Sequence, residues 1–500
     1  MSNYDIAFNE FIKKRGFFWQ TADLYGGLAG FYDYGHLGTL LKRNWEELWI
    51  DYFLNLGDNY YLIESSNILP EAVLKASGHV DHFTDVLVEC SKCKETYRGD
   101  HLVEEKVKLQ EELTDLDEIF KYIQELGIVC EKCGGELQKP TNFNMMFPLI
   151  VGSTGKDTGY LRPETAQGAY LNFYSEFNAL RRKIPMGLAI IGKVFRNEIS
   201  PRQGFFRVRE FTQAELQIFH DPKNFNDLFD FESIKDYKIN ICLVKDREKA
   251  DFKIKSCNEI LKISGLPEFY IYHMTKIQQF YFDILKLPKE KVRFYEKSDK
   301  ERAFYNQIHF DIEINFQQLG GFKEVAGLHY RGDYDLSCHE KGSKKKLSVK
   351  LDNGRKILLN VLELSFGVDR NILALLDCNF FIEDGRNILR IPPYLAPYHV
   401  GIFPLQRKDN LDEKAKEIYK NLRKGFRVFY DEVGSIGKRY ARLDEIGVPY
   451  CITVDYETLD KKHKDFDTVT IRFRDSKDQI RIKIKELEHW LEDNTKVNID

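Results

Sequence analysis

Polar and apolar residues alternate along two segments near the middle of the chain. From position 207 onward, every second residue is polar or aromatic, and most residues between them are apolar. The first set consists of Arg207, Arg209, Phe211, Gln213, Glu215 and Gln217. Because the side chains of a strand point alternately to its two faces, this pattern predicts a strand with a polar face over an apolar core. An earlier strand would carry Arg196 and Glu198 on one face, joined to the second by the turn-rich stretch 199–204.

The polar face of this predicted hairpin is strongly cationic. Eight lysines and arginines, but only one acid, Glu198, occur between Arg181 and Arg209. Arginine forks hold phosphates and carboxylates in a fixed geometry, and Phe211 offers a ring on which a base can stack. The pattern therefore favours binding of a polyanion, with a solvated sheet face as the alternative.

Two further periodic segments predict parts of the same framework. Apolar residues at helical spacing predict a long helix over residues 37–54, followed by a strand over 63–70 that ends in proline. Later, a strand over 358–366 carries Glu363 and Ser365 on one face. Gly367 ends this strand, and an apolar helix begins directly after it.

The last part of the chain follows an Ile-Pro-Pro linker at residues 391–393. Short buried-strand patterns alternate there with amphipathic helices, at 399–403, 427–430 and 450–454. This alternation predicts a small α/β domain with a mostly parallel or mixed sheet. The predicted division of the whole chain is a core over 1–85, 141–220 and 321–391, interrupted by insertions at 86–140 and 221–320, and a final domain over 392–500.

Bulk composition agrees with a cytoplasmic enzyme. Five hundred residues suggest two to four domains. A net charge of −4 does not mark the whole chain as a nucleic-acid binder, so such contacts must come from local patches. The first residues show no basic-then-apolar signal, and no run approaches about 18 apolar residues, so we expect no membrane segment. Nine cysteines in this context favour reduced thiols or a metal site over disulfides.

Four of these cysteines form two CxxC pairs, which are Cys90 with Cys93 and Cys130 with Cys133. Each pair can chelate from one turn, and two pairs provide the four ligands of a tetrahedral Zn²⁺. The 36 residues between the pairs exceed the usual zinc-ribbon gap. We predict a structural zinc site, with unligated reduced thiols as the alternative.

Four strings in the chain resemble, in the same order, the signatures of class II aminoacyl-tRNA synthetases and in detail those of the glycyl-tRNA synthetase family. They are Gly159-Tyr-Leu-Arg-Pro-Glu-Thr-Ala-Gln-Gly168, Asn197-Glu-Ile-Ser-Pro-Arg202, Arg331-Gly-Asp-Tyr-Asp-Leu336 and Glu363-Leu-Ser-Phe-Gly-Val-Asp-Arg370. The cationic hairpin resembles motif 2 of the class and the last string resembles motif 3. The helix and strand that end at Pro70 resemble motif 1, which builds the dimer interface. The resemblance extends from about residue 8 to about residue 490.

The resemblance implies an α+β fold, in which helices flank a class II synthetase antiparallel sheet and a C-terminal α/β anticodon-binding domain follows. It also implies a homodimeric cytoplasmic enzyme that uses ATP and Mg²⁺. Such an enzyme activates glycine to glycyl-adenylate, transfers glycine to the 3′ end of tRNA(Gly), and releases AMP and pyrophosphate.

By the same resemblance, several residues acquire roles in ATP binding and catalysis. Arg196 is expected to hold the α-phosphate and the amino-acid carboxylate, Glu198 the adenine end or a bridging water, and Arg207 the β- and γ-phosphates. Phe211 and Arg370 would cover the two faces of the adenine. The other expected ATP contacts are Asn197, Phe206, Glu324, Val325 and Gly367, of which Glu324 is a possible metal or ribose contact.

The resemblance further implies an acidic pit for the ammonium group of glycine, formed by Glu164, Glu215 and Glu363. The other expected substrate contacts are Arg98, Phe211, Arg331, Ser365 and Gly367. A filled pocket of this kind excludes any side chain, so no editing site is expected.

The sequence departs from the family pattern at three places that lie near the expected pocket. Gly99, Leu364 and the pair at 329–330 replace an alanine, a proline and an Ala-Asn pair. Two other functions fit parts of the same pattern. A synthetase for another small amino acid is disfavoured by the glycine-type context of the acids. An inactive nucleic-acid-binding paralogue would be expected to lose Arg196, Arg207 and Arg370, which are all present.

Overall fold

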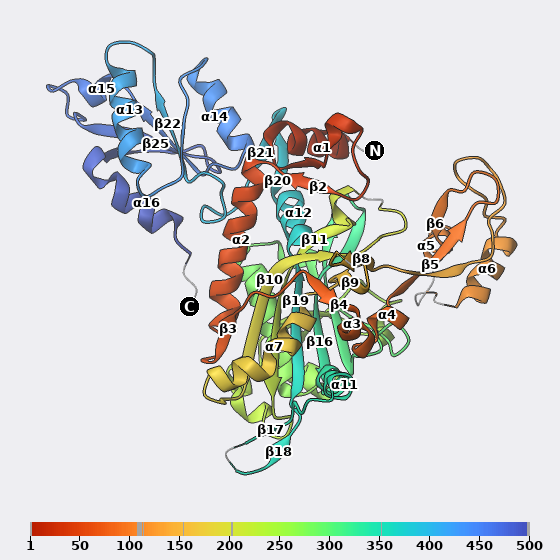
Figure 1. Ribbon diagram of the computed structural model, residues 1–500. Helices are drawn as coiled ribbons and strands as arrows, with labels where there is room; N and C mark the ends of the chain where they lie inside the picture. Colours follow the sequence, from red (N-terminus) through yellow and green to blue (C-terminus); the bar gives the residue numbers. More distant parts are fainter. Residues whose placement is uncertain are drawn as a thin grey trace.

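The computed structural model describes residues 3–107, 113, 115–153, 155–201, 204–351 and 353–497. A nine-stranded sheet forms the body of the molecule (Figure 1). Neighbouring strands are antiparallel except for β3 with β10 and β12 with β14. In spatial order the strands are β13 (Lys253–Ser256), β12 (Lys238–Cys242), β14 (Val292–Glu296), β15 (Ile308–Phe316), β16 (Gly321–Gly332), β19 (Asn360–Gly367), β11 (Glu210–His220), β10 (Met186–Phe195) and β3 (Tyr60–Leu62).

Helices cover both faces of this sheet, but unequally. On one face, α2 (His36–Leu54) and α12 (Val368–Asn379) bury their apolar sides against β11 and β19, with Trp49 and Phe366 in edge contact at 5.9 Å. The helix predicted over 37–54 and the helix predicted after Gly367 are confirmed as α2 and α12. On the other face, α7 (Ala166–Ala179) packs over β10 and the end of β11. The rest of that second face carries polar side chains.

Residues 221–320, which the sequence left without a role, extend the main sheet. They contribute β12 to β15, together with α9 (Cys257–Ser264) and α10 (Glu268–Gln279), and their apolar residues join the principal core. The smaller elements of the body are α1 (Asn3–Arg15), β1 (Phe18–Gln20), β2 (Tyr32–Tyr34), β4 (Ile68–Pro70), α3 (Glu71–Ala76), α4 (His79–His82), β8 (Phe147–Val151), β9 (Asp157–Leu161), α8 (Phe231–Ile234), α11 (Tyr334–Ser343), β17 (Val349–Lys350), β18 (Lys356–Ile357), β20 (Phe380–Glu383) and β21 (Arg386–Leu389).

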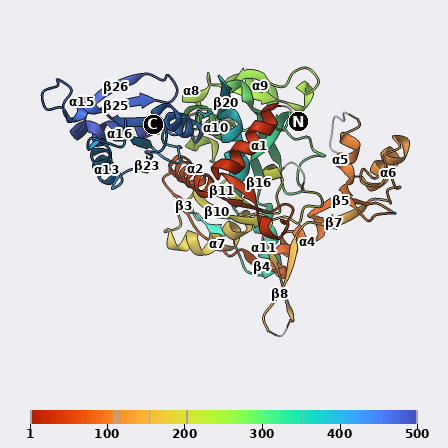
Figure 2. The same ribbon diagram turned by 90° about the horizontal axis from the view of Figure 1, so that it is seen from above.

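Around the cysteine pairs, the chain forms a separate lobe with its own small core. Its sheet has the order β6-β5-β7, and Figures 1 and 2 show it projecting from the body on the side away from the C-terminal domain. The lobe contains β5 (Thr84–Glu89), β6 (Thr96–Arg98), β7 (Thr141–Asn144), α5 (Gly99–Glu104) and α6 (Leu116–Glu125). Positions 108–112 and 114 of the predicted insertion lie outside the described residues.

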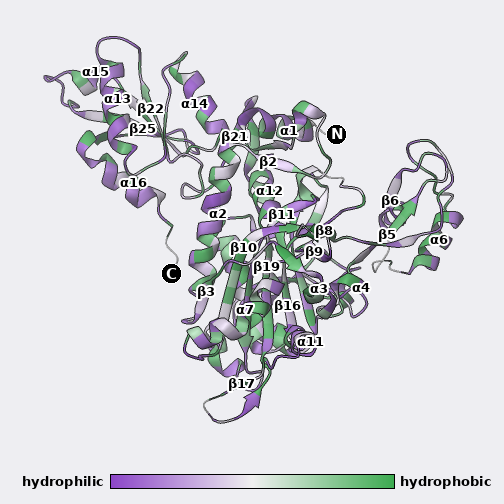
Figure 3. Cartoon of the chain, viewed as in Figure 1, coloured by the Kyte–Doolittle hydropathy of each residue, from purple (hydrophilic) through white to green (hydrophobic). Residues whose placement is uncertain are grey.

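The C-terminal domain has a mixed five-stranded sheet with the order β23-β22-β24-β25-β26. Pairs β22–β23 and β22–β24 are parallel and the others antiparallel, which confirms the predicted α/β pattern. Figure 3 shows hydrophilic residues along the outer sides of its helices. The elements are β22 (Val400–Pro404), α13 (Leu411–Leu422), β23 (Val428–Tyr430), α14 (Ile436–Glu445), β24 (Tyr450–Val454), α15 (Tyr456–Leu459), β25 (Thr468–Phe473), β26 (Gln479–Lys483) and α16 (Leu487–Thr495).

The buried side chain of Arg474 joins this domain to the body by donating to the carbonyl of Ile391 at 2.9 Å. Within the described ranges, every helix is too short or too polar to cross a membrane.

Candidate active site

Candidate functional side chains gather where β11 and β19 lie side by side, on the sheet face that α7 leaves open. The register places Gln217 opposite Glu363, Glu215 opposite Ser365, and Gln213 opposite Gly367. Because side chains on one face recur every second residue, these pairs form successive rows about 7 Å apart along the strands. Phe211 continues the same face beyond Gln213. The sheet therefore aligns acidic groups and an aromatic ring along one line.

The hairpin of the cationic segment differs from its prediction. β10 ends at Phe195 and β11 begins at Glu210, so Arg196, Glu198, Arg207 and Arg209 lie in the connection and not in strands. One bond of the ladder continues there, from the amide of Arg196 to the carbonyl of Arg209 at 2.9 Å, and other hydrogen bonds follow. The amide of Glu198 bonds back to the carbonyl of Arg196 at 2.7 Å, and the guanidinium of Arg209 donates twice to the Glu198 carbonyl, at 2.8 and 3.1 Å. Arg202, also in the predicted motif, lies outside the described residues.

Seven predicted ATP-binding residues, with others, line one cavity, which we call the arginine cavity. Its lining residues are Arg196, Glu198, Phe205, Phe206, Arg207, Val208, Phe211, Gly367, Asp369 and Arg370. The guanidinium of Arg196 lies 5.3 Å from the ring centre of Phe211. The guanidinium of Arg370 lies 4.7 Å from the ring centre of Phe206. Two planar cations beside two rings suit a flat base carrying phosphates.

Arg370 occupies the first turn of α12, where the helix N-terminus also favours an anion. It donates to a carboxylate oxygen of Glu324 at 3.0 Å. Glu324 itself is about half exposed at the edge of the site. In contrast, the side chain of Val325 is buried in the core, and its carbonyl accepts from Asn371 at 3.0 Å. Asn197 is half-buried, and its amide bonds the carbonyl of Met145.

A network of charges connects the arginine cavity to the cysteine lobe. Arg207 lies 3.9 Å from the Glu198 carboxylate and 3.1 Å from a ring nitrogen of His101. Burial, reinforced by the nearby cations Arg98 and Arg207, lowers the pKa of His101 to about 4. Arg98 pairs with Asp85 at 3.0 Å and with Asp100. Burial raises the pKa of Asp85 to about 6, although Arg98 opposes that shift.

The three acids predicted to form the pit, Glu164, Glu215 and Glu363, lie together as buried carboxylates, and we call this cluster the carboxylate pocket. Glu215 lies at its centre: Ser365 donates to one of its oxygens at 2.7 Å and Thr165 to the other at 2.6 Å. Glu164 accepts from Gln167 at 2.8 Å. These hydroxyl and amide donors hold the carboxylates in place while they share a small volume.

Arg331 is the cation that allows three acids to lie so close together. It is fully buried, donates twice to Asp335 at 2.7 and 2.9 Å, and donates to Glu363 at 3.0 Å. Its guanidinium also lies 3.9 Å from the ring centre of Tyr305. Since Asp335 already takes two of its hydrogen bonds, the three glutamates together retain an excess of negative charge that suits a ligand ammonium group.

The three glutamates titrate differently because they face different partners. Burial alone would raise the pKa of Glu164, but Arg331 and His79 lower it below its ordinary value. For Glu215, burial and the charge of Glu164 raise the pKa. For Glu363, burial raises the pKa to about 8, with Glu215 and Glu164 adding to the rise and Arg331 opposing it. A strongly perturbed acid in a polar pocket is typical of a ligand-binding site.

The structure adds residues to the site that the sequence did not assign. Thr165, Gln167 and Asp335 stand inside the quoted strings, so their motif membership was a usable signal. Asp369 also stands in one of them, and it accepts from the amide of Thr212 at 2.5 Å. His79, 3.5 Å from Glu164, belongs to no pattern that could have identified it.

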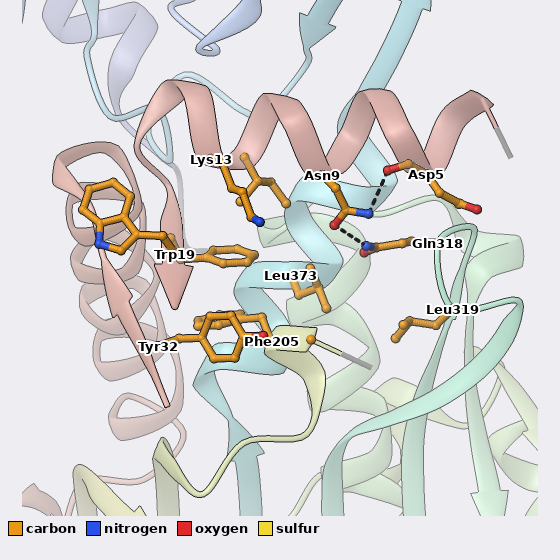
Figure 4. Close-up of a pocket in the computed structure, with 12 residues that line it drawn as sticks. Asp5, Asn9, Lys13, Trp19, Tyr32, Phe205, Gln318, Leu319 and Leu373 are labelled. Carbon is orange, nitrogen blue, oxygen red and sulfur yellow. Dashed lines mark hydrogen bonds between the residues drawn. The ribbon is translucent and has the colours of Figure 1, made fainter. Parts of the chain in front are cut away.

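A second, larger cavity of about 450 Å³ adjoins the arginine cavity (Figure 4). The ring of Phe205 borders both and is stacked on Phe18 at 3.9 Å. Figure 4 shows Asn9 bonded to Gln318 across the upper side of this cavity, at 3.0 Å.

The four predicted metal ligands come together in the lobe. Each offers a sulfur atom, and these four atoms all lie within 4.8 Å of one another. The Cys90–Cys133 and Cys93–Cys130 sulfur distances are both 3.5 Å. A tetrahedral zinc with bonds of about 2.3 Å needs sulfur separations of about 3.8 Å. The cluster therefore fits such an ion closely.

Comparison with known proteins matches most of the chain. Residues 150–379 match the tRNA synthetase class II core domain (G, H, P, S and T), and residues 399–494 match an anticodon binding domain. The glycine–tRNA ligase of Pyrococcus furiosus is 38% identical, with 97% of this chain and 98% of the relative covered. The glycine–tRNA ligase of Thermococcus sibiricus is 36% identical, with 96% of this chain and 97% of the relative covered. The glycine–tRNA ligase of Methanocaldococcus jannaschii is 35% identical, with 97% of this chain and 98% of the relative covered.

Proposed function

The chain belongs to the glycine–tRNA ligase family of class II aminoacyl-tRNA synthetases, and from that premise we propose how its residues activate glycine with ATP and transfer it to tRNA(Gly). One observation supports the assignment of residues most directly. The carboxylate pocket and the arginine cavity adjoin along the same face of β11 and β19, so an ammonium-bearing substrate and a nucleotide would meet end to end. The site roles below follow from this arrangement.

In the first step, a carboxylate oxygen of glycine attacks the α-phosphorus of ATP. The bond from that phosphorus to the bridging oxygen of the β-phosphate breaks, and pyrophosphate leaves. Arg196 holds the α-phosphate and the glycine carboxylate, so that the attacking oxygen and phosphorus are close and oriented. Arg207 and Arg370 neutralise charge on the departing phosphates. Phe211 supports the adenine ring.

In the second step, a ribose hydroxyl at the 3′ end of tRNA attacks the glycyl carbonyl carbon. The carbonyl–phosphate bond breaks, the hydroxyl proton is released, and AMP departs. Arg196 remains beside the phosphate oxygens on which negative charge returns. Mg²⁺ would neutralise the phosphate charge during activation, and the half-exposed Glu324 carboxylate beside Arg370 is suited to hold it.

Selection of glycine follows from how fully the pocket is occupied by protein atoms. Ser365 and Thr165 already bond both oxygens of Glu215, and Arg331 and Gln217 both donate to one oxygen of Glu363. The ammonium group of glycine can bind the acids, whereas a β-carbon would have to displace a hydrogen-bonded group. Larger amino acids are therefore excluded by size and by the cost of breaking buried polar contacts.

The test of this assignment is amino-acid-dependent exchange of pyrophosphate into ATP, with glycine, alanine and serine compared. We expect exchange with glycine alone. Glu215→Gln should abolish it, because the residue loses its charge but keeps its shape, while Glu210→Gln, on the same strand but outside the pocket, should retain it. Exchange that depends on alanine or serine would contradict the pocket assignment. Glycine-dependent exchange that persists in Glu215→Gln would also contradict the pocket assignment.

We further propose that the enzyme is a homodimer in the cytoplasm. Strand β3 forms one edge of the main sheet, and Leu62 on it is 45% exposed. Ile68 on β4, in the same motif 1 segment, is 46% exposed. An exposed edge strand with apolar side chains favours pairing with another chain. All nine cysteines are free thiols in the structure, as expected in a reducing compartment.

Zinc at the four cysteines is also part of the proposal, with a structural role. No open coordination position would remain at a site with four sulfur ligands, so the ion would stabilise the lobe without taking part in the reaction. Metal analysis of the purified protein should find one zinc per chain. Cys93→Ser should lower that content and the thermal stability of the lobe, whereas Cys338→Ser, at a cysteine outside the cluster, should change neither.

A further inference from the structure

Strand β6 lies between the four cysteines and the arginine cavity. It has only three residues, Thr96–Arg98, and it follows the first cysteine pair after two intervening residues. Successive strand side chains point to opposite faces. Tyr97 is 3% exposed and belongs to the small core of the lobe, together with Cys90 and Cys130. Arg98, the next residue, points away from that core and pairs with Asp85 and Asp100.

One hydrogen bond joins β6 to the metal ligands directly. The hydroxyl of Tyr97 lies 3.1 Å from the sulfur of Cys130. A metal-bound cysteine is a thiolate and can only accept a hydrogen bond, so in the zinc-loaded protein Tyr97 would donate to it. Because Cys130 belongs to the second pair, this bond ties β6 to both halves of the metal site.

On its other side, β6 touches the connection between β10 and β11. The hydroxyl of Ser200 donates to the carbonyl of Thr96 at 2.9 Å. His101, three residues after Arg98, lies 3.1 Å from Arg207, which lines the arginine cavity. A small cavity between the two segments is lined by Arg98, His101, Ser200 and Arg207, among others. A shift of β6 would therefore displace Ser200 and, through His101, the Arg207 side chain of the proposed ATP site.

We propose that metal occupancy of the four cysteines controls ATP binding, and that Tyr97 is the positioning residue that transmits it to Arg98 and Arg207. This inference rests on the proposed function for its biological meaning. In the zinc-loaded protein, the ion would fix the two cysteine pairs, and the Cys130 thiolate would hold the Tyr97 hydroxyl. Strand β6 would then hold Arg98, His101 and the contact with Ser200 in position. Without the ion, the two pairs are no longer joined and β6 loses that anchor.

The experiment measures the dissociation constant of ATP by calorimetry in zinc-loaded and zinc-stripped full-length protein, for wild type and for Tyr97→Phe. Stripping with a chelator should weaken ATP binding in wild type, and added zinc should restore it. Tyr97→Phe should keep one zinc per chain yet bind ATP about fivefold more weakly, as expected for the loss of one hydrogen bond. Stripping zinc from Tyr97→Phe should then cause a smaller additional loss than in wild type.

Tyr122→Phe is the matched control, because Tyr122 packs against the same small core from α6. It should retain zinc and wild-type affinity for ATP. An affinity for ATP in Tyr97→Phe equal to that of wild type would overturn the proposal. So would an equal loss of ATP affinity on zinc removal in wild type and in Tyr97→Phe, or a purified protein that binds no zinc. If glycine-dependent exchange is missing while ATP binding still follows zinc and Tyr97, the proposed function fails and the coupling stands.

Discussion

At the scale of single residues, the charge state of Glu363 is the property of the carboxylate pocket most open to experiment. Its carboxylate accepts from Arg331 at 3.0 Å and from Gln217 at 2.7 Å. Burial nevertheless raises its pKa to about 8, and the charges of Glu215 and Glu164 add to the rise. Burial and these two charges therefore disfavour the ionised form of Glu363 before substrate binds.

This charge state predicts a pH dependence of glycine binding. An ammonium ion binds more tightly to an ionised carboxylate, so the KM for glycine should fall as pH rises from about 7 to about 9, through the pKa of Glu363. Glu363→Gln cannot ionise, and its KM should be higher and nearly independent of pH over the range in which glycine stays protonated. Exchange kinetics at several pH values measure both. A pH profile that is unchanged in Glu363→Gln would contradict this assignment.

Arg331 is expected to matter for stability more than any surface charge. Arg331→Gln would leave Asp335 and Glu363 buried without their cation. Removing one partner of a buried ion pair typically costs about 3–5 kcal/mol, so the free energy of unfolding in urea should fall by that order. Lys14→Gln removes one partner of an exposed pair with Glu10 and should change little. A loss in Arg331→Gln as small as that in Lys14→Gln would show that the network relaxes without its cation.

At the scale of elements, helix α12 carries Arg370 to the arginine cavity, and its first turn is fixed by one carboxylate. Asp369 is buried and accepts from the amide of Thr212 on β11 and from the hydroxyl of Tyr34 on β2, both at 2.5 Å. The carboxylate thereby fastens the helix start to two strands at once. The orientation of Arg370 depends on that attachment.

Asp369→Asn is therefore expected to separate nucleotide binding from glycine binding. The amide accepts less strongly than a carboxylate, so the KM for ATP should rise several-fold while the KM for glycine stays nearly constant. Asp377→Asn is the control, because Asp377 accepts from the amides of Gln317 and Gln318 at the far end of the same helix. It should cost similar thermal stability but leave both KM values unchanged. Equal kinetic effects of the two substitutions would refute a local role for Asp369.

The sequence predicts elements whose signal is local. The periodicity of α2, the break at Gly367 and the strand patterns of the C-terminal domain are all readable within about 20 residues. The alignment of Glu215 with Ser365 cannot be predicted from a local pattern. The two residues lie 150 positions apart, and only the register of β11 with β19 brings them together. Arg207 and Arg209 have a strand-like pattern because their alternation with apolar residues continues that of β11. In the structure one ladder bond persists, from the amide of Arg196 to the carbonyl of Arg209, and the Arg209 side chain bonds the carbonyl of Glu198.

At the scale of the whole molecule, the two edges of the main sheet differ in their surroundings. β3 forms one edge and lies between the helix and the strand that were predicted as motif 1, while β13 forms the other edge, with Ile254 64% exposed. The proposed dimer uses only the β3 side. An acidic residue introduced at each edge should therefore have different effects.

Leu62→Glu is expected to convert the proposed dimer to a monomer of 58.8 kDa, because it would place a charge in the proposed apolar interface. Ile254→Glu should leave the dimer intact. Sedimentation velocity at several protein concentrations distinguishes these outcomes. A wild-type chain that sediments as a monomer, or a Leu62→Glu chain that remains dimeric, would remove β3 from the interface.

The position of β19 in the sheet has a consequence for how the protein is made. This strand, residues 360–367, lies between β16 and β11, which precede it in the chain. During synthesis, the ribosome therefore releases two sheet edges that must wait, unpaired, for a strand that emerges later. Nascent chains that stop short of residue 367 would expose those edges and would be prone to associate with one another. Reliable production of this protein thus depends on how quickly translation delivers its central strand.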